Sequence, residues 1–455
     1  MRPSLIRDLF HFAWPVLIAQ VAVMSNGVID TVMAGRLSAV DLAAVGIGAA
    51  IYVTVFVTVM GVLLALTPSV SQLYGAGRHA GIGEEVRQSA WLALLLGVPV
   101  MVLLRHPEPF LGLSQLTPAV EFKVRAYLGA LSWSVLPSLL FRVFYAFSSG
   151  IGKPRPIMVF NLIGVALKVP LNLVFIHGAF GMPALGGPGC AVSTAVIGWL
   201  SCLLAWSWCA RAAEYRPYRI FADFSGPRSA KLWALLKLGL PIGATFLVDV
   251  TAFTFMALFI ARLGPATSGA HQIAANLAAL TFMLPLSLGN AASVLAGQAL
   301  GAGDARRARH AGLVGMAVGA SFGALTSLVL WLGADTIAGL YTNRAEVRVA
   351  AAVLIGHVAA YHLFDALQAV AMSVLRGYKK TAVPMAIYAV ALWGIGLGGG
   401  YVLGLTDAFG PPRGAAGFWL AAILSLALAG GLVTGYFFRV SRPRTAPTCF
   451  PQCKA

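Results

Sequence analysis

Long apolar segments follow one another along this chain and are separated by short polar ones. About 20 consecutive apolar residues form a helix long enough to cross a bilayer. Twelve segments meet that length and predict helices over residues 11–34, 42–72, 88–105, 122–148, 156–177, 189–210, 237–262, 270–298, 311–334, 347–374, 383–404 and 414–438. We therefore expect an all-α polytopic membrane protein with twelve transmembrane helices.

The apolar pattern occurs twice along the chain. Residues 15–77 match residues 241–303 without a gap, at an offset of 226. Matched pairs are Pro15 with Pro241, Ile47 with Ile273, Gln72 with Gln298 and, at an offset of 227, Gly150 with Gly377. Self-similarity at a fixed offset in an apolar chain indicates an internal structural repeat. Each repeat then contains six of the predicted helices.

Composition supports a membrane protein over a soluble one. Of 455 residues, 59% are hydrophobic and 10% charged, and the mean hydropathy is +0.83. Soluble domains carry about 25% charged residues. The net charge of +17 lies in short loops, where it sets membrane topology. No basic and aromatic surface exists outside the apolar segments, so we expect no nucleic-acid partner.

The basic residues predict the orientation of the chain. Of 32 Lys and Arg residues, 22 lie at the two termini and in the loops after the second, fourth, sixth, eighth and tenth predicted spans. These segments all lie on the same side of the membrane. The positive-inside rule places that side, with both termini, in the cytoplasm. Both repeats then insert alike and are related by a pseudo-twofold axis along the membrane normal. The expected parts are a six-helix lobe over 1–210, a cytoplasmic linker over 211–236, a second six-helix lobe over 237–440 and a cytoplasmic tail over 441–455.

Three carboxylates lie deep in apolar segments: Asp30, Asp249 and Asp365. A carboxylate at the middle of a membrane costs several kcal/mol, about 2.5–3.5 on insertion scales. Such a group holds a proton, a cation or a basic partner, and the alternative is a polar anchor between helices. Asp249 and Asp365 both belong to the second repeat, which predicts that they face one cavity.

Polar side chains accompany these acids at helical spacing. Tyr361, Asp365 and Gln368 stand at i, i+4 and i+7 on one stripe, and Gln272 and Asn276 form an i, i+4 pair. The predicted cation or proton site comprises Asp249, Asp365, Asp30, Tyr361 and Gln272, with Asn172, Asn276 and Gln368 as supporting polar residues.

Lys168 lies near the middle of the fifth predicted span. An ammonium group at that depth needs a partner, and Asp30 is the natural candidate in the same repeat. The alternative is that the side chain extends to the membrane interface.

Enzyme chemistry is not indicated by the remaining motifs. The sequence contains no GxxxxGK[ST] motif and no nucleophile–base or metal cluster, so we expect neither enzymatic activity nor a cofactor. Cys449 and Cys453 stand at i, i+4 in the polar tail, which is weak support for a metal or redox pair because no histidine accompanies them.

Five segments carry a resemblance to a known family. They are residues 29–37 (IDTVMAGRL), 43–46 (AAVG), 189–191 (GCA), 271–274 (HQIA) and 375–379 (LRGYK). In order and spacing they resemble the signatures of the multidrug and toxic compound extrusion (MATE) family. The resemblance covers about residues 5–440 and is closest to the norfloxacin-exporting bacterial branch.

This resemblance implies two six-helix lobes around a central cleft, in the inner membrane of a bacterium. It implies export of organic cations in exchange for H+ or Na+. The family's key carboxylates fall on Asp30, Asp249 and Asp365. Two positions depart from the family: Asp249 is usually Glu, and Lys168 is usually Asn, with Asn172 retained one turn on.

The leading hypothesis is therefore a secondary multidrug antiporter that works by alternating access, as a monomer surrounded by lipid. Phe253, Met256, Phe282 and Met283 are candidates for a drug-binding surface, or else are core or lipid-facing residues. The alternative function is a flippase of lipids or lipid-linked precursors, which favours a cationic cleft and is opposed by three intramembrane acids. A passive channel or a membrane receptor is a further alternative. Neither function requires duplicated halves with acids at unequal positions.

Overall fold

The structure is a computed structural model and describes residues 3–112, 116–179, 181–222 and 225–442. Within those ranges twelve helical segments are long and apolar enough to cross a membrane. The prediction of an all-α protein with twelve spans is confirmed. Cys449 and Cys453 lie outside the described residues.

The first repeat forms the N lobe. Its helices are α1 (Pro3–Gly35), α2 (Ala39–Leu63), α3 (Leu66–Gly75), α4 (His79–Arg105), α5 (Glu108–Leu111), α6 (Pro118–Gly150), α7 (Arg155–His177) and α8 (Gly189–Arg211). The second predicted span is divided into α2 and α3, and Pro68 lies in the first turn of α3, where its missing N–H is tolerated.

The second repeat forms the C lobe, which follows a short 3₁₀ helix, η1 (Ala213–Tyr218), in the connecting segment. Its helices are α9 (Ser229–Ala261), α10 (Pro265–Gly301), α11 (Ala305–Leu332), α12 (Ala334–Tyr341), α13 (Ala345–Gly377), α14 (Ala382–Ala389), the π-helical segment η2 (Val390–Gly398), α15 (Gly399–Leu405) and α16 (Gly414–Val440). The bounds of α9 follow those of α1 by 226 residues, and the bounds of α13 follow those of α6 by 227. The helix boundaries therefore repeat at the offsets seen in the sequence.

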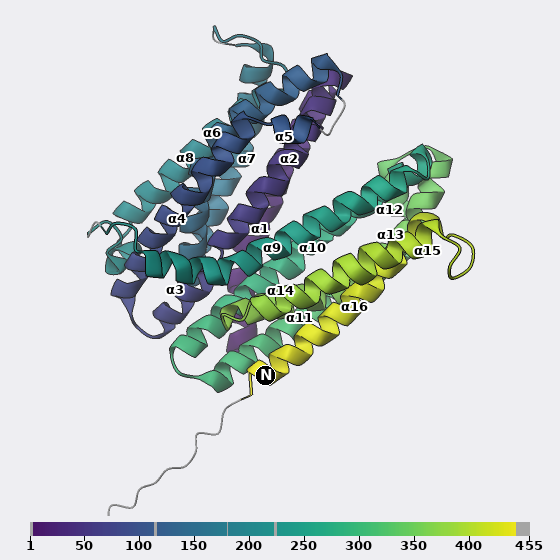
Figure 1. Cartoon of the computed structure of the whole chain (residues 1–455). Coiled ribbons are helices and arrows are strands. Elements are labelled where there is room, and N and C mark those ends of the chain that lie inside the picture. The colour runs from purple at the N-terminus through teal and green to yellow at the C-terminus, as the bar shows by residue number, and fades with distance from the viewer. Residues whose placement is uncertain (1–2, 113–115, 180, 223–224, 443–455) are drawn as a thin grey trace, which may run out of the picture.

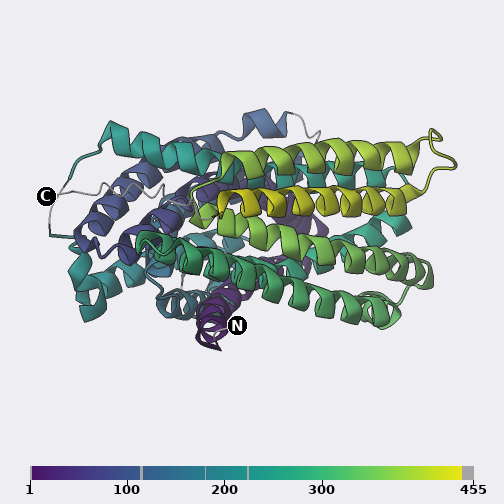
Figure 2. The same ribbon diagram turned by 90° about the horizontal axis from the view of Figure 1, so that it is seen from below.

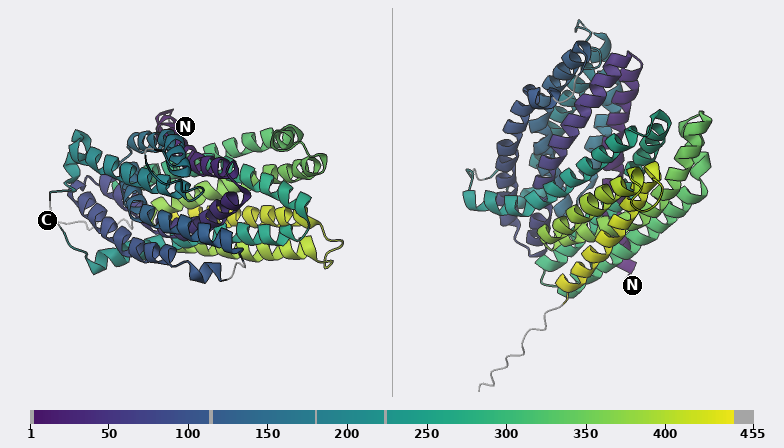
Figure 3. Two further views of the ribbon diagram at one scale, coloured as in Figure 1. Left: turned by 90° about the horizontal axis from the view of Figure 1, so that it is seen from above. Right: turned by 45° about the vertical axis from the view of Figure 1, so that its right-hand side comes forward.

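The two lobes touch at one end of the molecule and diverge toward the other. Figure 1 shows the α3–α4 and α10–α11 connections together at the end where the lobes meet, with the N-terminus of α1 at the same end. Seen from below in Figure 2 the two bundles overlap, whereas the right-hand view in Figure 3 shows them beside each other and diverging from the end that carries the N-terminus. Helix α3 packs against α10, and α2 packs against α9, so these pairs form the junction.

Each lobe receives the beginning of one helix from the other repeat. Leu5 and Leu9 of α1 are buried in the core cluster of the C lobe. Leu235 and Ile242 of α9 are buried in the core cluster of the N lobe. The N-terminal parts of α1 and α9 are thus exchanged between the bundles, and this exchange ties the lobes together.

Candidate functional site

The first part of the site lies on one stripe of α13. Tyr361, Asp365 and Gln368 are each 4% exposed. Their spacing over two turns places them on the same side of the helix, and the helices that pack on α13 cover that side. The stripe predicted from the sequence is therefore turned into the C lobe.

Asp249, on α9, is partly buried and has a phenol as its partner. The Tyr388 hydroxyl, on α14, donates a hydrogen bond of 2.8 Å to Asp249 Oδ1. Hydrogen bonds to charged groups contribute about 1.5–3 kcal/mol, more than neutral ones. Asp249 and Asp365 are near enough to interact electrostatically. The charge of each C-lobe acid therefore affects the other.

Asp365 differs from Asp249 because its carboxyl group accepts no hydrogen bond from any described residue. The Nδ1 atom of His362, one turn earlier on α13, lies 4.0 Å from Asp365 Oδ2. Both ring nitrogens of His362 are buried and likewise have no hydrogen-bond partner among the described residues. A buried carboxyl group without donors is a place for a proton or a cation.

A small cavity adjoins Asp249 within the C lobe. It has a volume of about 60 Å³. Its polar lining consists of Thr245, Asp249, Gln368, Arg376, Lys380, Thr381 and Tyr388, and Phe282 and Met372 supply part of its apolar wall. A buried water requires about 10–15 Å³, so a few waters fit, whereas drug-sized ligands occupy about 300–1,000 Å³. The cavity extends from Asp249 to Arg376, at the end of α13, and to Lys380, in the connection between α13 and α14.

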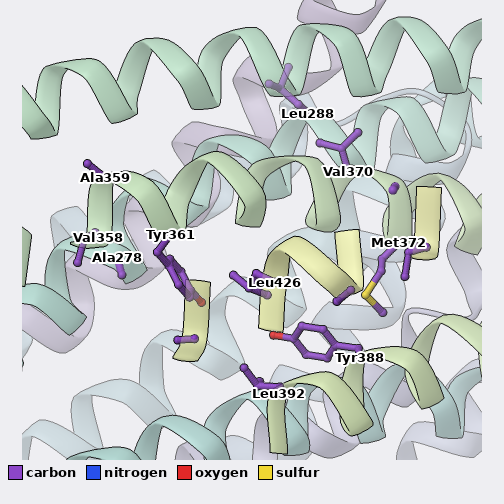
Figure 4. Close-up of a cluster of buried hydrophobic side chains, with 14 of the residues drawn as sticks. Ala278, Leu288, Val358, Ala359, Tyr361, Val370, Met372, Tyr388, Leu392 and Leu426 are labelled. Carbon is purple, nitrogen blue, oxygen red and sulfur yellow. The ribbon is translucent and has the colours of Figure 1, made fainter. Parts of the chain in front are cut away.

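Aromatic rings surround Tyr361, at the end of the stripe formed by Tyr361, Asp365 and Gln368. The Tyr361 ring stands edge-on to the rings of Phe253 and Trp419, with centroids 6.2 and 5.5 Å away. Figure 4 shows the side chains of Tyr361, Leu426, Tyr388 and Met372 in sequence along this part of the bundle. The Trp419 indole N–H is buried without a partner among the described residues. The surroundings of Tyr361 are therefore mainly aromatic, whereas those of Asp249 include several polar side chains.

The N lobe holds a different arrangement around Asp30. Lys168 Nζ lies 2.9 Å from Asp30 Oδ1, and both side chains are buried, with 1% and 9% exposed. Asn172 Nδ2 donates to the same oxygen over 2.8 Å. The structure thus places Lys168 beside Asp30 and does not direct it to the membrane interface.

Oxygen atoms from the start of α8 complete the surroundings of the ammonium group. Lys168 Nζ donates to Cys190 O at 3.0 Å, Ser193 Oγ at 3.1 Å and Thr194 Oγ1 at 2.6 Å. Ser193 Oγ also donates to Asn172 Oδ1. An ammonium group has three N–H donors, and here four acceptors surround it. Every donor of Lys168 is therefore satisfied within the protein.

Other predicted residues lie away from these groups. Gln272 is exposed on α10, and the exposed Asn276 accepts a hydrogen bond of 3.2 Å from Tyr341. Among the proposed drug contacts, Phe282 lines the cavity beside Asp249. Met256 is 6% exposed and packs in the C-lobe core. Met283 is partly buried and is not part of the cavity lining.

Sequence reasoning missed Tyr388 and the α8 oxygens. Tyr388 is the only hydroxyl-bearing residue over positions 382–400, which is a signal that the sequence does contain. Ser193 and Thr194 stand next to each other near the start of the sixth span. Ser and Thr hydroxyl groups in membrane helices often form hydrogen bonds to the backbone of their own helix. Their presence in a span therefore does not indicate a partner on another helix.

Comparisons with known proteins agree with this architecture. The family model described as MatE matches residues 15–174 and 241–402, one match in each repeat. The probable multidrug resistance protein NorM of Aromatoleum aromaticum is 42% identical over 447 residues, which cover 97% of this chain and 96% of that protein. The multidrug resistance protein PmpM of Pseudomonas aeruginosa is 40% identical, with 92% of this chain and 88% of that protein covered.

Solved structures show the same fold. The MATE transporter NorM-NG, solved in a complex that includes a monobody, matches with a TM-score of 0.80 and 34% identity over 95% of each chain. The eukaryotic MATE transporter AtDTX14 matches with a TM-score of 0.86 at 18% identity, over 96% of this chain and 98% of that one, and shows the fold alone. Two matched repeats, near-complete coverage and this identity lead to one conclusion: the chain belongs to the MATE family of multidrug efflux transporters.

Proposed function

We propose that this protein exports organic cations and other drugs from the cytoplasm in exchange for H+ or Na+. Exchange requires that binding of the ion and binding of the drug disfavour each other. The two lobes, joined at one end and divergent at the other, supply two bodies that rock against each other. One copy of the chain contains both lobes, and we propose that the monomer is the transporting unit.

The observation that carries this proposal is the C-lobe acid pair. Asp365 is 4% exposed and receives no hydrogen bond from the described residues, while Asp249 borders a cavity that admits water. A proton or Na+ that binds there neutralises charge in an apolar bundle and so changes the stability of one lobe arrangement relative to the other. We assign ion coupling to Asp249 and Asp365.

The N lobe is proposed not to carry the coupling ion. Lys168 already compensates the charge of Asp30 at 2.9 Å, and its remaining donors are satisfied by oxygens of α8. A second cation at this position is opposed by the fixed ammonium charge. We therefore propose one ion site, in the C lobe, with H+ at least as suitable as Na+.

Purified protein in liposomes tests the proposed function. Ethidium transport is measured under a Na+ gradient alone, under a pH gradient alone, and without any gradient. We expect one of the two ion gradients to drive dye accumulation, with none in the third case. Equal dye movement in all three conditions contradicts antiport and indicates a passive pathway.

Tyr388→Phe is expected to change the ion dependence of transport without lowering the amount of folded protein in the membrane. The phenol donor stabilises the charged form of Asp249, so its removal weakens Na+ binding and strengthens proton binding. A lost hydrogen bond to a charged group corresponds to about tenfold or more. Half-maximal ethidium transport should therefore require about tenfold more Na+ or about tenfold less H+.

Tyr401→Phe is the matched control for this substitution. Tyr401 lies on α15 in the same span, is 42% exposed and makes no hydrogen bond to the described residues. Its loss of a hydroxyl should leave the ion dependence unchanged. Identical behaviour of the two variants contradicts a role for Tyr388 at the ion site.

We further propose that the protein resides in a bacterial inner membrane with both termini and the 211–236 linker in the cytoplasm. Ser229 is exposed at the start of α9, and Ala408 is exposed in the last connection, at the other end of the spans. In intact cells, a cysteine at Ala408 should react with a membrane-impermeant thiol reagent, whereas a cysteine at Ser229 should react only after lysis. The reverse pattern contradicts the orientation.

A further inference from the structure

Two glutamines form reciprocal hydrogen bonds between the lobes. Gln72 Nε2, on α3 of the N lobe, donates to Gly377 O of the C lobe over 2.9 Å. Gln298 Nε2, on α10 of the C lobe, donates to Gly150 O of the N lobe over 3.0 Å. Gln72 and Gln298 are equivalent in the repeat, and so are the two glycines. We propose that these glutamines are positioning residues for transport, which together hold the lobes closed at the end that carries the termini.

The acceptors explain why a glutamine is required at each position. Gly150 is the last residue of α6, and Gly377 is the last residue of α13. The final carbonyl groups of a helix have no partner within that helix. No backbone N–H outside the helices donates to either carbonyl in the described residues. Each glutamine therefore completes the end of a helix in the opposite lobe, and separation of the lobes leaves both helix ends unsatisfied unless water enters.

The backbones of the two lobes are in direct contact at this junction. A Cβ atom on Gly75 would overlap the backbone carbonyl oxygen of Gln298, and a Cβ on Gly301 would overlap that of Gln72. A Cβ on Gly297 would overlap the Ser71 hydroxyl. The first two crossings are again equivalent in the repeat. Glycine is required here because α3 and the end of α10 are in direct backbone contact.

This contact lies between the two lobes, where it acts on their opening and closing. The inference therefore depends on the proposed mechanism of alternating access. The glutamines lie at the junction seen in Figure 1, on the helices that adjoin the α3–α4 and α10–α11 connections. For a drug to enter from the cytoplasm, the lobes must separate at this end. Two neutral hydrogen bonds are strong enough to favour closure and weak enough to be broken in each cycle, since each contributes about a fivefold preference.

Distances between spin labels measure this closure without any transport assay. Ala76 and Ala302 are exposed, equivalent in the repeat, and adjacent to the junction. Labels at these two positions are placed in a variant without the five native cysteines, in liposomes, with neither drug nor ion gradient. Gln72→Met and Gln298→Met keep side-chain size but remove the donor. We expect each to raise the ratio of long to short distances about fivefold, and the double variant to raise it about 25-fold.

Several controls make the result decisive. Gln20→Met, on α1, removes an amide that makes no hydrogen bond to the described residues and should leave the distances unchanged. Labels at Leu37 and Leu263, at the opposite end, should move closer as the junction opens. Gly75→Ala with Gly301→Ala retains both glutamines and should open the junction by steric overlap.

An unchanged distance distribution in the double glutamine variant overturns the proposal. Opening caused by only one of the two glutamines contradicts the reciprocal arrangement. The measurement uses neither drug nor ion gradient. Its outcome is therefore independent of whether the protein exchanges drugs for ions, and the two proposals can fail separately.

Discussion

Asp365→Asn is expected to abolish gradient-driven efflux while the protein remains folded and inserted. Asn is close in size to Asp but neither binds a proton at physiological pH nor carries the charge that attracts a cation. Asp365 is 4% exposed and receives no hydrogen bond from the described residues, so the substitution removes no protein hydrogen bond. The expected change is a loss of ethidium transport to the level of empty liposomes, together with unchanged membrane yield and unchanged elution on size exclusion.

Asp335→Asn provides the matched control in the same lobe. Asp335 lies on α12, is exposed and forms an ion pair with Arg348 at 2.5 Å. Exposed ion pairs contribute little to stability, so this substitution should leave both transport and yield near those of the parent. Gradient-driven transport that persists in Asp365→Asn contradicts the assignment of Asp365 to ion coupling.

Lys168→Asn is expected to destabilise the N lobe strongly. Removal of one partner from a buried ion pair leaves an uncompensated charge and costs about 3–5 kcal/mol. Here the charge left behind is that of Asp30, whose carboxylate still accepts a hydrogen bond from Asn172 but has lost its cationic partner. We expect a lower midpoint of thermal unfolding in detergent, lower membrane yield, or an altered ion dependence because Asp30 becomes available to a cation.

The double variant Asp30→Asn with Lys168→Asn tests whether the two residues act as a pair. If they do, the double variant recovers part of the stability that either single substitution removes. A double-mutant cycle measures that interaction energy directly. Strict additivity of the two losses contradicts pairing, and a gain of stability in Lys168→Asn alone contradicts the compensating role of the ammonium group.

The sequence alone determined the membrane class, the twelve spans, the duplication and the three intramembrane acids. Each depends on local features: apolar segments of sufficient length, a fixed offset between repeats, and charge where charge is costly. Tyr361, Asp365 and Gln368 followed from the period of a single helix. The sequence also singled out Lys168 and Asp30 as residues in need of partners.

Tertiary structure decided which groups meet. Tyr388 reaches Asp249 across 139 residues of sequence, and Thr194 reaches Lys168 because the start of α8 packs against α7. Gln72 and Gln298 are visible as a repeated pair in the sequence, yet their acceptors are helix ends in the opposite lobe. Such partners depend on how each helix is rotated and which helices touch. A repeated pattern of apolar residues fixes neither, because most faces of a membrane helix are apolar whether they contact lipid or protein.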